Sequence, residues 1–223
     1  DLSGVDLRER DLRKADLRHC TLREADLSEA DLSDADLSDA NLSNADLAGA
    51  NLSNARLARA NLIGAQLQGA VWSSVDFSNR DLRRFDFANC NLSWANLSNA
   101  NLTNAKLAHA NLSHADLSGA DLSGADLSGA DLTGCCWRSA NLSRVQLPSR
   151  ALTHCDLSHT NLSYCNLSNA DLSHADLSHA DLSWARLPFA HLTGTNLDGA
   201  TLIAADLTGV ELRGRSLAGR DLS

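Results

Sequence analysis

The side chains of this chain that could carry out chemistry are eight histidines, six cysteines and 28 acidic residues. Histidine titrates near neutral pH and binds transition metals. Four histidines recur close together and are the candidates for a metal site or a pH-sensitive patch: His154, His159, His174 and His179. No suitably placed carboxylate or thiolate completes a closed metal site beside them. The sequence therefore predicts exposed histidines, with neither a metal ion nor another cofactor.

The cysteines form no recognisable motif. Their spacings match neither a disulfide-rich secreted scaffold nor a paired zinc-ligand motif. All but one occupy a position that elsewhere in the chain holds alanine, so they are predicted to be reduced, small packing residues. The six are Cys20, Cys90, Cys135, Cys136, Cys155 and Cys165.

The element that must position these side chains is a five-residue repeat. Every fifth residue from Leu2 to Leu222 is leucine, except for Trp72, Phe77, Phe87 and Trp137. We name the five positions of each unit the Ala slot, the Asp slot (Asp or Asn), the Leu slot, and the first and second corner slots. The first corner slot holds mostly Ser or Thr, and the second is variable. The apolar, polar, apolar alternation of the first three slots predicts a short strand.

Glycine and proline indicate where the chain turns. All 13 glycines lie in the second corner slot, and both prolines, Pro148 and Pro188, lie in the first. A type II turn favours Pro at its first central position and Gly or Asn, with positive φ, at its second. Apolar residues that are alternately two and three positions apart do not keep to one face of an α-helix. The pattern therefore excludes an amphipathic helix and favours a coiling β-solenoid.

The repeat, nearly pure in the segment ADLSGADLSGADLSGADLTG from Ala115 to Gly134, resembles the pentapeptide-repeat family over essentially the whole chain. The resemblance implies an all-β fold, a right-handed quadrilateral β-helix (β-solenoid) with four pentapeptides, or 20 residues, per coil and no α-helix. About eleven coils spaced by ~4.8 Å make a rod about 50 Å long. We expect one solenoid over residues 1–223. Because the chain contains no Met, we expect it to be a piece of a longer protein.

Arginine in the Ala slot is the main departure from the pattern. It occurs at Arg10, Arg80, Arg150, Arg215 and Arg220. An unpaired charge inside an apolar solenoid is very costly. Arginines near either end can lean out of an open coil, but Arg80 and Arg150 cannot. Since Trp72 and Phe85 lie close to Arg80, and Trp137 precedes Arg150, the sequence predicts local widening, a bend or a changed turn at residues 71–90 and 135–155.

With the 20-residue coil that the resemblance implies, residues 20 apart form columns along the rod. Arg144, Tyr164 and Trp184 form one outward column, with Pro188 and Phe189 at the next corner. Exposed aromatic residues beside an arginine are typical of a binding hot spot. Scattered aromatic residues are nevertheless common on protein surfaces, and that alternative stays open.

The same register stacks two pairs of histidines, His154 with His174 and His159 with His179. At the start of the chain it places one arginine at each corner of a single coil, followed by acidic residues in the next coil. The arginines are Arg8, Arg13, Arg18 and Arg23. We expect ion pairs between coils here, each with a small effect on stability.

A leucine-filled rod offers no concave site for a nucleophile, a base and an orienting group. We therefore expect the chain not to be an enzyme. The favoured function is a rigid structural scaffold or protein–protein interaction module that binds an unidentified protein partner. An end coil or the aromatic patch could also mediate dimerisation.

The resemblance implies one alternative, because some pentapeptide-repeat proteins imitate duplex DNA, bind DNA gyrase, and protect it from quinolones or inhibit it. A DNA mimic needs rows of carboxylates, and the column through Asp6, Asp26, Asp46, Asp86 and Asp126 supplies some. Many Asp slots hold Asn instead, and the net charge of -9 is modest for imitating DNA. Those gyrase-binding proteins also have a Phe-rich axis, a loop that breaks the repeat and a C-terminal dimer module, none of which is visible in this sequence.

Charge and hydropathy limit the partners further. The net charge of -9 disfavours direct binding to nucleic acid. No apolar run is long enough for a membrane span, and no charged-then-apolar leader opens the chain, so we expect no membrane insertion. A cytoplasmic location is the expectation that follows.

Overall fold

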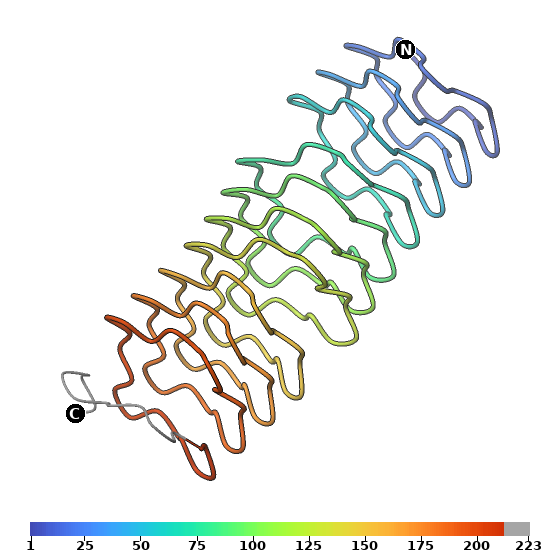
Figure 1. Cartoon of the computed structure of the whole chain (residues 1–223). Helices are drawn as coiled ribbons and strands as arrows, with labels where there is room; N and C mark the ends of the chain where they lie inside the picture. The colour runs from blue at the N-terminus through green and yellow to red at the C-terminus, as the bar shows by residue number, and fades with distance from the viewer. Residues whose placement is uncertain (212–223) are drawn as a thin grey trace.

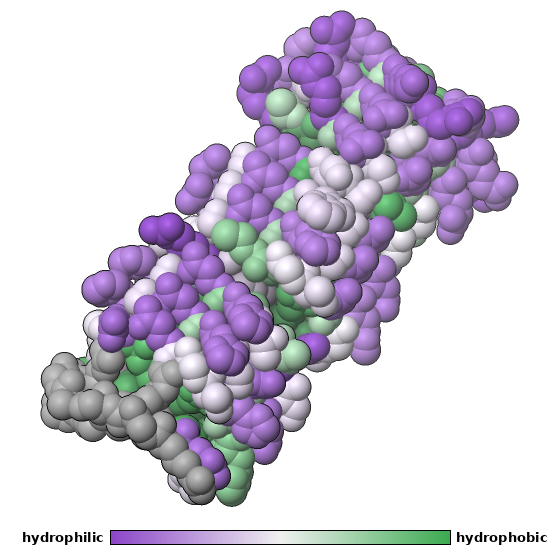
Figure 2. Space-filling view, viewed as in Figure 1, coloured by the Kyte–Doolittle hydropathy of each residue, from purple (hydrophilic) through white to green (hydrophobic). Residues whose placement is uncertain are grey.

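The computed structural model describes residues 1–211, which form one rod of stacked coils (Figure 1). Within that range the chain contains no helix, and therefore none that is long and apolar enough to cross a membrane. Most of the visible surface is hydrophilic, with small apolar areas between the polar ones (Figure 2). Two of the arginines singled out above, Arg215 and Arg220, lie outside the described residues.

Parallel bridges join the Asp slot of one coil to the Asp slot of the next. The bridged residues are 20 positions apart, from the pair Asp6 and Asp26 to the pair Arg186 and Asp206. One coil therefore takes 20 residues, or four units. The sequence predicts three-residue strands, but each unit pairs through one isolated bridge residue. The difference arises because a corner begins two residues after every bridge and interrupts the pairing before a longer strand can form.

The hydrogen bonds of a single unit explain the preferences of its slots. In the unit 31–35, the backbone N–H groups of Asp31, Leu32 and Asp34 donate to carbonyl oxygens of neighbouring coils. The N–H of Ala35 closes the turn onto the Leu32 carbonyl at 3.0 Å, and the N–H of Ser33 donates to the Asp31 carboxylate at 3.0 Å. Asp and Asn are preferred because both have a side-chain oxygen that accepts this bond. All five backbone donors of the unit are thereby paired.

The second corner slot has a left-handed backbone throughout the described chain. From Gly4 to Gly209 its φ lies between 51° and 75°, at glycine and other residues alike. This matches the type II corner that the glycines and prolines indicate. Positive φ is readily adopted by glycine but is unfavourable for bulky side chains, so an aromatic residue in this slot is held there against its own backbone preference.

Leucine and alanine fill the interior, and aromatic residues replace them in one region. Trp72, Phe77 and Phe87 are fully buried, and Phe85 is half-buried. The ring centroid of Phe87 lies 6.0 Å from that of Phe77 and 5.8 Å from that of Phe85, and the centroids of Trp72 and Phe77 are 5.4 Å apart. These four rings form one packed cluster, which we call the aromatic core cluster.

The ladder between coils is interrupted beside this cluster. No bridge joins residues 56–70 to residues 76–90, although the units before and after them are bridged. Arg80 reaches across the interruption: its Nη1 donates to the Leu57 carbonyl at 3.0 Å and its Nη2 to the Ala60 carbonyl at 2.5 Å. The coils are visibly farther apart on one side of the rod here (Figure 1). Arg80 therefore pairs with backbone carbonyls of the coil before it.

A second interruption has the same construction. No bridge joins residues 126–140 to residues 146–160. Arg150 donates from Nη1 to the Ala130 carbonyl at 3.0 Å and from Nη2 to the Leu127 carbonyl at 2.7 Å. The 70 residues that separate the two arginines equal three and a half coils, so the two openings face opposite sides of the rod. They overlap the ranges 71–90 and 135–155, where the sequence predicts local distortion.

Candidate functional site

Arg144, Tyr164 and Trp184 lie in one column along a corner of the rod. The Arg144 Cζ lies 5.9 Å from the centroid of the Tyr164 ring. The Tyr164 and Trp184 rings are parallel to within 3°, with their centroids 6.1 Å apart. Both rings remain largely exposed, at 53% for Tyr164 and 55% for Trp184. The column thus presents a cation and two stacked aromatic rings to solvent.

All three residues occupy the second corner slot, with φ of 65°, 59° and 60°. Glycine or asparagine would adopt this conformation more readily than an aromatic residue. The same positive φ occurs at every second corner slot of the described chain, so the exposed aromatic rings, and not the backbone, distinguish this column. We call Arg144, Tyr164 and Trp184 the aromatic column.

Pro188 and Phe189 lie at a different corner. Phe189 is 56% exposed and Pro188 is half-buried. Within residues 1–211, no ring contact joins Phe189 to the aromatic column. The Phe189 ring instead lies beside Gly209 of the next coil. The structure therefore groups three of the five predicted patch residues and separates the other two.

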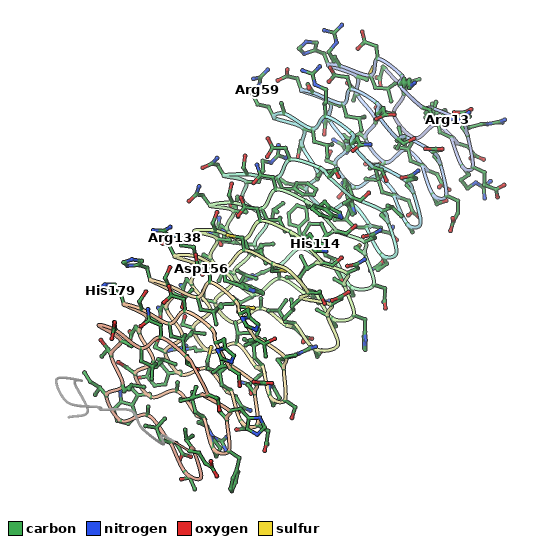
Figure 3. The ribbon with its side chains drawn as sticks, viewed as in Figure 1. Arg13, Arg59, His114, Arg138, Asp156 and His179 are labelled. Atoms are coloured by element: carbon green, nitrogen blue, oxygen red, sulfur yellow. The ribbon has the colours of Figure 1, made fainter. Side chains whose placement is uncertain are left out.

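The four histidines form two stacked pairs. The rings of His154 and His174 are 5.1 Å apart and parallel to within 7°, and those of His159 and His179 are 4.9 Å apart at 13°. His179 projects from the same edge of the rod as Arg59, six coils away (Figure 3). Stacked imidazoles face each other, whereas their nitrogen lone pairs lie in the ring planes and do not converge on one point. Within the described residues, no three His, Cys, Asp or Glu side chains are grouped to hold a metal ion.

Glycines of the following coil make room for several of these rings. A Cβ built on Gly194 would lie 2.3 Å from Nδ1 of His174, whereas one built on Gly69 would meet nothing within 4 Å. The two glycines have the same φ of 72°. The backbone therefore favours glycine equally at the two positions, and only Gly194 also makes room for a ring, that of His174.

We expect Gly194→Ala to destabilise the protein more than Gly69→Ala does, by about 0.5–1 kcal/mol, because only the first change displaces a ring from its rotamer. Both changes should also carry a backbone penalty of about 1 kcal/mol. Denaturant unfolding measures the difference, and the imidazole chemical shifts of His174 should move only in Gly194→Ala. Equal destabilisation by both changes would contradict the seating role.

The cysteines are free thiols in the structure, and Cys136 is the exposed one. Burial raises the pKa of Cys90 to about 11 and the pKa values of Cys135 and Cys165 to about 12. A thiol with such a pKa carries almost no nucleophilic thiolate at neutral pH. Cys155 is only half-buried, so it packs less completely than its alanine slot predicts.

The interior residues that break the pattern border the two ladder openings. Trp72 and Trp137 are fully buried in Leu slots, while Arg80 and Arg150 are half-buried. Burial lowers the pKa of Arg80, although an arginine remains charged in proteins. The charge is accommodated through backbone carbonyls and not through a carboxylate.

The first opening also forms a pocket that was not expected from the sequence. Its volume is about 830 Å³, and its lining includes Ile63, Arg84 and Phe85. Ile63 is 71% exposed. The available signal was that Ile63 is a large apolar residue in a slot of mostly Ser and Thr, and that Arg84 lies in the same column as Arg144, 60 residues earlier.

The arginines of the first coil pair mainly within their own units. Arg8 binds the Asp6 carboxylate through two hydrogen bonds of 3.0 and 2.7 Å, while its distance to Asp26 of the next coil is 3.5 Å. The same arrangement occurs between Arg13 and Asp11, and Arg13 projects from the rod near its N-terminal end (Figure 3). The expected pairing between coils is therefore secondary to pairing between residues two apart.

We expect Arg8→Ala to raise the pKa of Asp6 from about 2 toward 3.8, because the hydrogen bond from the Arg8 side chain is the largest cause of its low value. Since folding lowers this pKa, the pair stabilises the end coil above about pH 4, and the contribution is lost as the pH falls toward 2. An NMR titration of the Asp6 carboxyl measures the change, with Arg56→Ala as the control. A titration of Asp6 near 3.8 in the unaltered protein would rule out this pairing in solution.

Comparisons with known proteins agree with this geometry. The family model described as pentapeptide repeats matches in eight copies, over residues 1–39, 35–71, 73–107, 86–124, 95–134, 125–149, 151–188 and 175–214. Among solved structures, the chain is similar to HetL, a pentapeptide repeat protein involved in heterocyst differentiation regulation from the cyanobacterium Nostoc sp. strain PCC 7120. The identity is 33%, the TM-score is 0.62, and the match covers 92% of this chain and 91% of HetL.

A second similar structure is that of trypsin-treated QnrB1, a plasmid-mediated fluoroquinolone resistance protein. The identity is 22%, the TM-score is 0.51, and the match covers 87% of this chain and 91% of that one. At this identity the likeness concerns the fold. A search of curated proteins found no match.

Proposed function

Because the chain belongs to the pentapeptide-repeat family, we propose that it is a non-catalytic, rigid scaffold that binds a protein partner through the aromatic column. The proposed scaffold is a right-handed, four-sided rod of about eleven coils and about 50 Å in length. Its columns hold side chains at fixed spacings, so that a binding surface is ordered before the partner arrives. Preorganisation of this kind reduces the entropy that binding must offset.

The observation that carries the proposal is the exposure of two stacked aromatic rings in a slot that favours glycine. Tyr164 and Trp184 leave more than half of their surface in solvent, and their positive φ is unfavourable for bulky residues. The positive φ closes every corner of the rod, so the exposure of the two rings is the feature that favours a partner. Tyr, Trp and Arg are also the residues that most often dominate binding energy at protein interfaces.

The chemistry of the chain supports a role without catalysis. The buried thiols have raised pKa values, and the histidines are stacked on one another. In the pocket beside Phe85, Asp81 is paired with Arg83 at 2.7 Å and Asp86 with Lys106 at 3.1 Å. A carboxylate held by a cation has a lowered pKa and is a weak general base.

The regulatory role of HetL, which is 33% identical, is compatible with a partner-binding role for this chain. HetL is involved in heterocyst differentiation regulation, and the match covers 92% of this chain and 91% of HetL. Binding to a regulatory protein is the simplest way for a scaffold to act in such a process.

A DNA-mimicking topoisomerase binder is the second candidate. The bridged column Asp6, Asp26 and Asp46 gives it some support. However, Gln66 and Lys106 interrupt that column before Asp86 and Asp126, and Arg8 neutralises Asp6. A supercoiling assay with DNA gyrase tests this candidate directly. We expect no inhibition and no protection from quinolones at micromolar protein, and either effect would favour the mimic over the scaffold.

The proposed function predicts that Tyr164→Ala combined with Trp184→Ala will abolish binding to the protein partner while leaving the rod folded. Hot-spot residues each contribute about 2 kcal/mol or more, so the double change should weaken binding at least a hundredfold. Crosslinking in the source cells followed by mass spectrometry identifies the partner, and titration calorimetry measures its affinity. Trp94→Ala, which removes an exposed ring from another column, is the matched control. Equal affinity of the double variant and the unaltered protein would show that the aromatic column is not the interface.

A further inference from the structure

One corner of the rod connects the pocket at the first ladder opening with the aromatic column. It consists of the two corner slots of seven successive coils, which we call the corner groove. Its residues are Ile63, Gly64, Arg83, Arg84, Thr103, Asn104, Ser123, Gly124, Ser143, Arg144, Ser163, Tyr164, Ser183 and Trp184. Bridged coils are about 4.8 Å apart and the first of the six steps crosses the ladder opening, so the groove from Ile63 to Trp184 is at least about 29 Å long.

The surface along this corner is hollowed in two adjoining places. The pocket of about 830 Å³ beside Ile63 and Phe85 extends to Thr103 and Asn104. A smaller hollow of about 360 Å³ begins at the same two residues and ends at Tyr164. Gly124 lines the second hollow, and the Asn104 side chain of the preceding coil lies against it. The two hollows therefore adjoin at Thr103 and Asn104, and we call them together the track.

The charge of this track is opposite to that of the whole molecule. The protein has 28 acidic residues and a net charge of -9, yet none of the corner-groove residues is acidic. Arg84 and Arg144 are exposed, and among the described residues neither has a carboxylate partner. The acidic side chains that border the pocket, Asp81 and Asp86, are paired with Arg83 and Lys106. The track thus offers two free cations about 14 Å apart, at three coils of about 4.8 Å.

Apolar side chains lie beside both cations. Ile63 and Phe85 line the pocket with Arg84, and Tyr164 lies next to Arg144. Because the Tyr164 and Trp184 rings stack along the column, their edges point away from the rod. The edge of an aromatic ring carries partial positive charge and attracts anions. Each end of the groove therefore combines a cation with an apolar contact.

We propose that the corner groove binds an extended, acidic segment of the partner protein, at least about nine residues long. The length follows from a span of at least about 29 Å at about 3.3 Å per extended residue. Carboxylates about four residues apart would meet Arg84 and Arg144, and apolar side chains between or beside them would contact Ile63, Phe85 and Tyr164. This inference rests on the proposed function and specifies the chemistry of the partner.

The experiment is a selection of random twelve-residue peptides on the unaltered protein, with the Arg84→Glu, Arg144→Glu double variant as the counter-selection. We expect the enriched peptides to be acidic with at least one apolar residue. Their affinity, measured by fluorescence polarisation, should fall at least about tenfold in the double variant and decline with salt. Arg138→Glu combined with Arg186→Glu makes the same change of charge outside the groove and should have no comparable effect.

Enriched peptides that are neutral or basic, or that bind the double variant equally well, would overturn the proposal. So would the absence of any enriched peptide. A twelve-nucleotide single-stranded DNA is tested in parallel, since phosphates could also pair with two arginines. Tight binding of that DNA with the same dependence on Arg84 and Arg144 would overturn the proposal and assign the groove to nucleic acid instead of a peptide.

Failure of the acidic-segment proposal can be distinguished from failure of the proposed scaffold function. If the protein partner still depends on Tyr164 and Trp184 but acidic peptides do not bind, the scaffold function stands and the acidic segment is wrong. If acidic peptides bind the groove but the natural partner ignores Tyr164 and Trp184, the groove stands and the assignment of the interface to the aromatic column is wrong.

Discussion

Replacement of Arg80 with alanine will destabilise the rod by about 2–4 kcal/mol, although alanine is the commonest residue in that slot. Arg80 donates to the carbonyls of Leu57 and Ala60 at 3.0 and 2.5 Å. A hydrogen bond from a charged group contributes roughly 1.5–3 kcal/mol, and the sum is reduced because the side chain is only half-buried. We expect the ladder not to close in compensation, because the large rings of the aromatic core cluster are packed beside the opening.

Denaturant unfolding followed by circular dichroism measures this effect. Arg80→Met keeps most of the apolar stem and removes the donors, so it should lose nearly as much stability as Arg80→Ala. Arg84→Ala removes an exposed arginine with no partner among the described residues, and we expect a change within about 0.5 kcal/mol. If Arg80→Ala is as stable as the unaltered protein, or more stable, the coils can close without the arginine and its bonds do not hold the opening.

The repeating part of the fold could be predicted from the sequence because each unit meets the same surroundings in every coil. Leu and Ala alternate with Asp, and the turn residues are local signals. For this reason the buried leucines and the positive φ of the second corner slot agree with the pattern. The number of residues per coil cannot be predicted from the repeat in this way, because any multiple of five residues is compatible with the pattern. Only the hydrogen bonds between coils establish the spacing of 20.

How the two ladder openings form could not be predicted from the sequence, because the repeat pattern does not show which contacts form between coils. Arg80 is recognisable as an anomaly, but its acceptors are the carbonyls of Leu57 and Ala60, which belong to the preceding coil. The Ala60 carbonyl is available because the coils part here, whereas in bridged coils the carbonyl of the Ala slot accepts a backbone N–H from the next coil. For a related reason, the sequence does not single out Ile63 and Arg84: the corner slots tolerate nearly any residue, so a residue type there predicts little. Their importance comes from the pocket between two coils.

The same limit applies to the histidines. Their order in the sequence is compatible with a metal site, because two pairs lie 20 residues apart. Whether paired imidazoles can share an ion depends on ring orientation, and here the rings of His154 and His174 are parallel to within 7°. Orientation is set by the fixed φ of the corner and by the glycine that follows each column, such as Gly194 beside His174.

Phe87→Ala will have the largest effect of any change considered, a loss of about 3–5 kcal/mol. Phe87 is fully buried and lies at the centre of the aromatic core cluster, 6.0 Å from Phe77 and 5.8 Å from Phe85. Its removal leaves a cavity that neighbouring coils cannot fill, because their positions are fixed by the ladder on the faces that remain bridged. Phe85, which is only half-buried, then loses the ring on which it packs.

The consequence should be local before it is global, since each coil of a solenoid contacts only its neighbours. We expect hydrogen exchange of the amides in residues 72–90 to accelerate in Phe87→Ala while residues 96–120 keep most of their protection. Phe189→Ala, which removes the same side chain from an exposed site, should change stability by about 0.5 kcal/mol or less. Phe87→Leu restores the commonest residue of the slot and should lose less than Phe87→Ala, because leucine fills more of the space. A uniform loss of protection along the rod would contradict the idea that the aromatic core cluster stabilises one opening. It would show that Phe87 contributes to the stability of the whole solenoid.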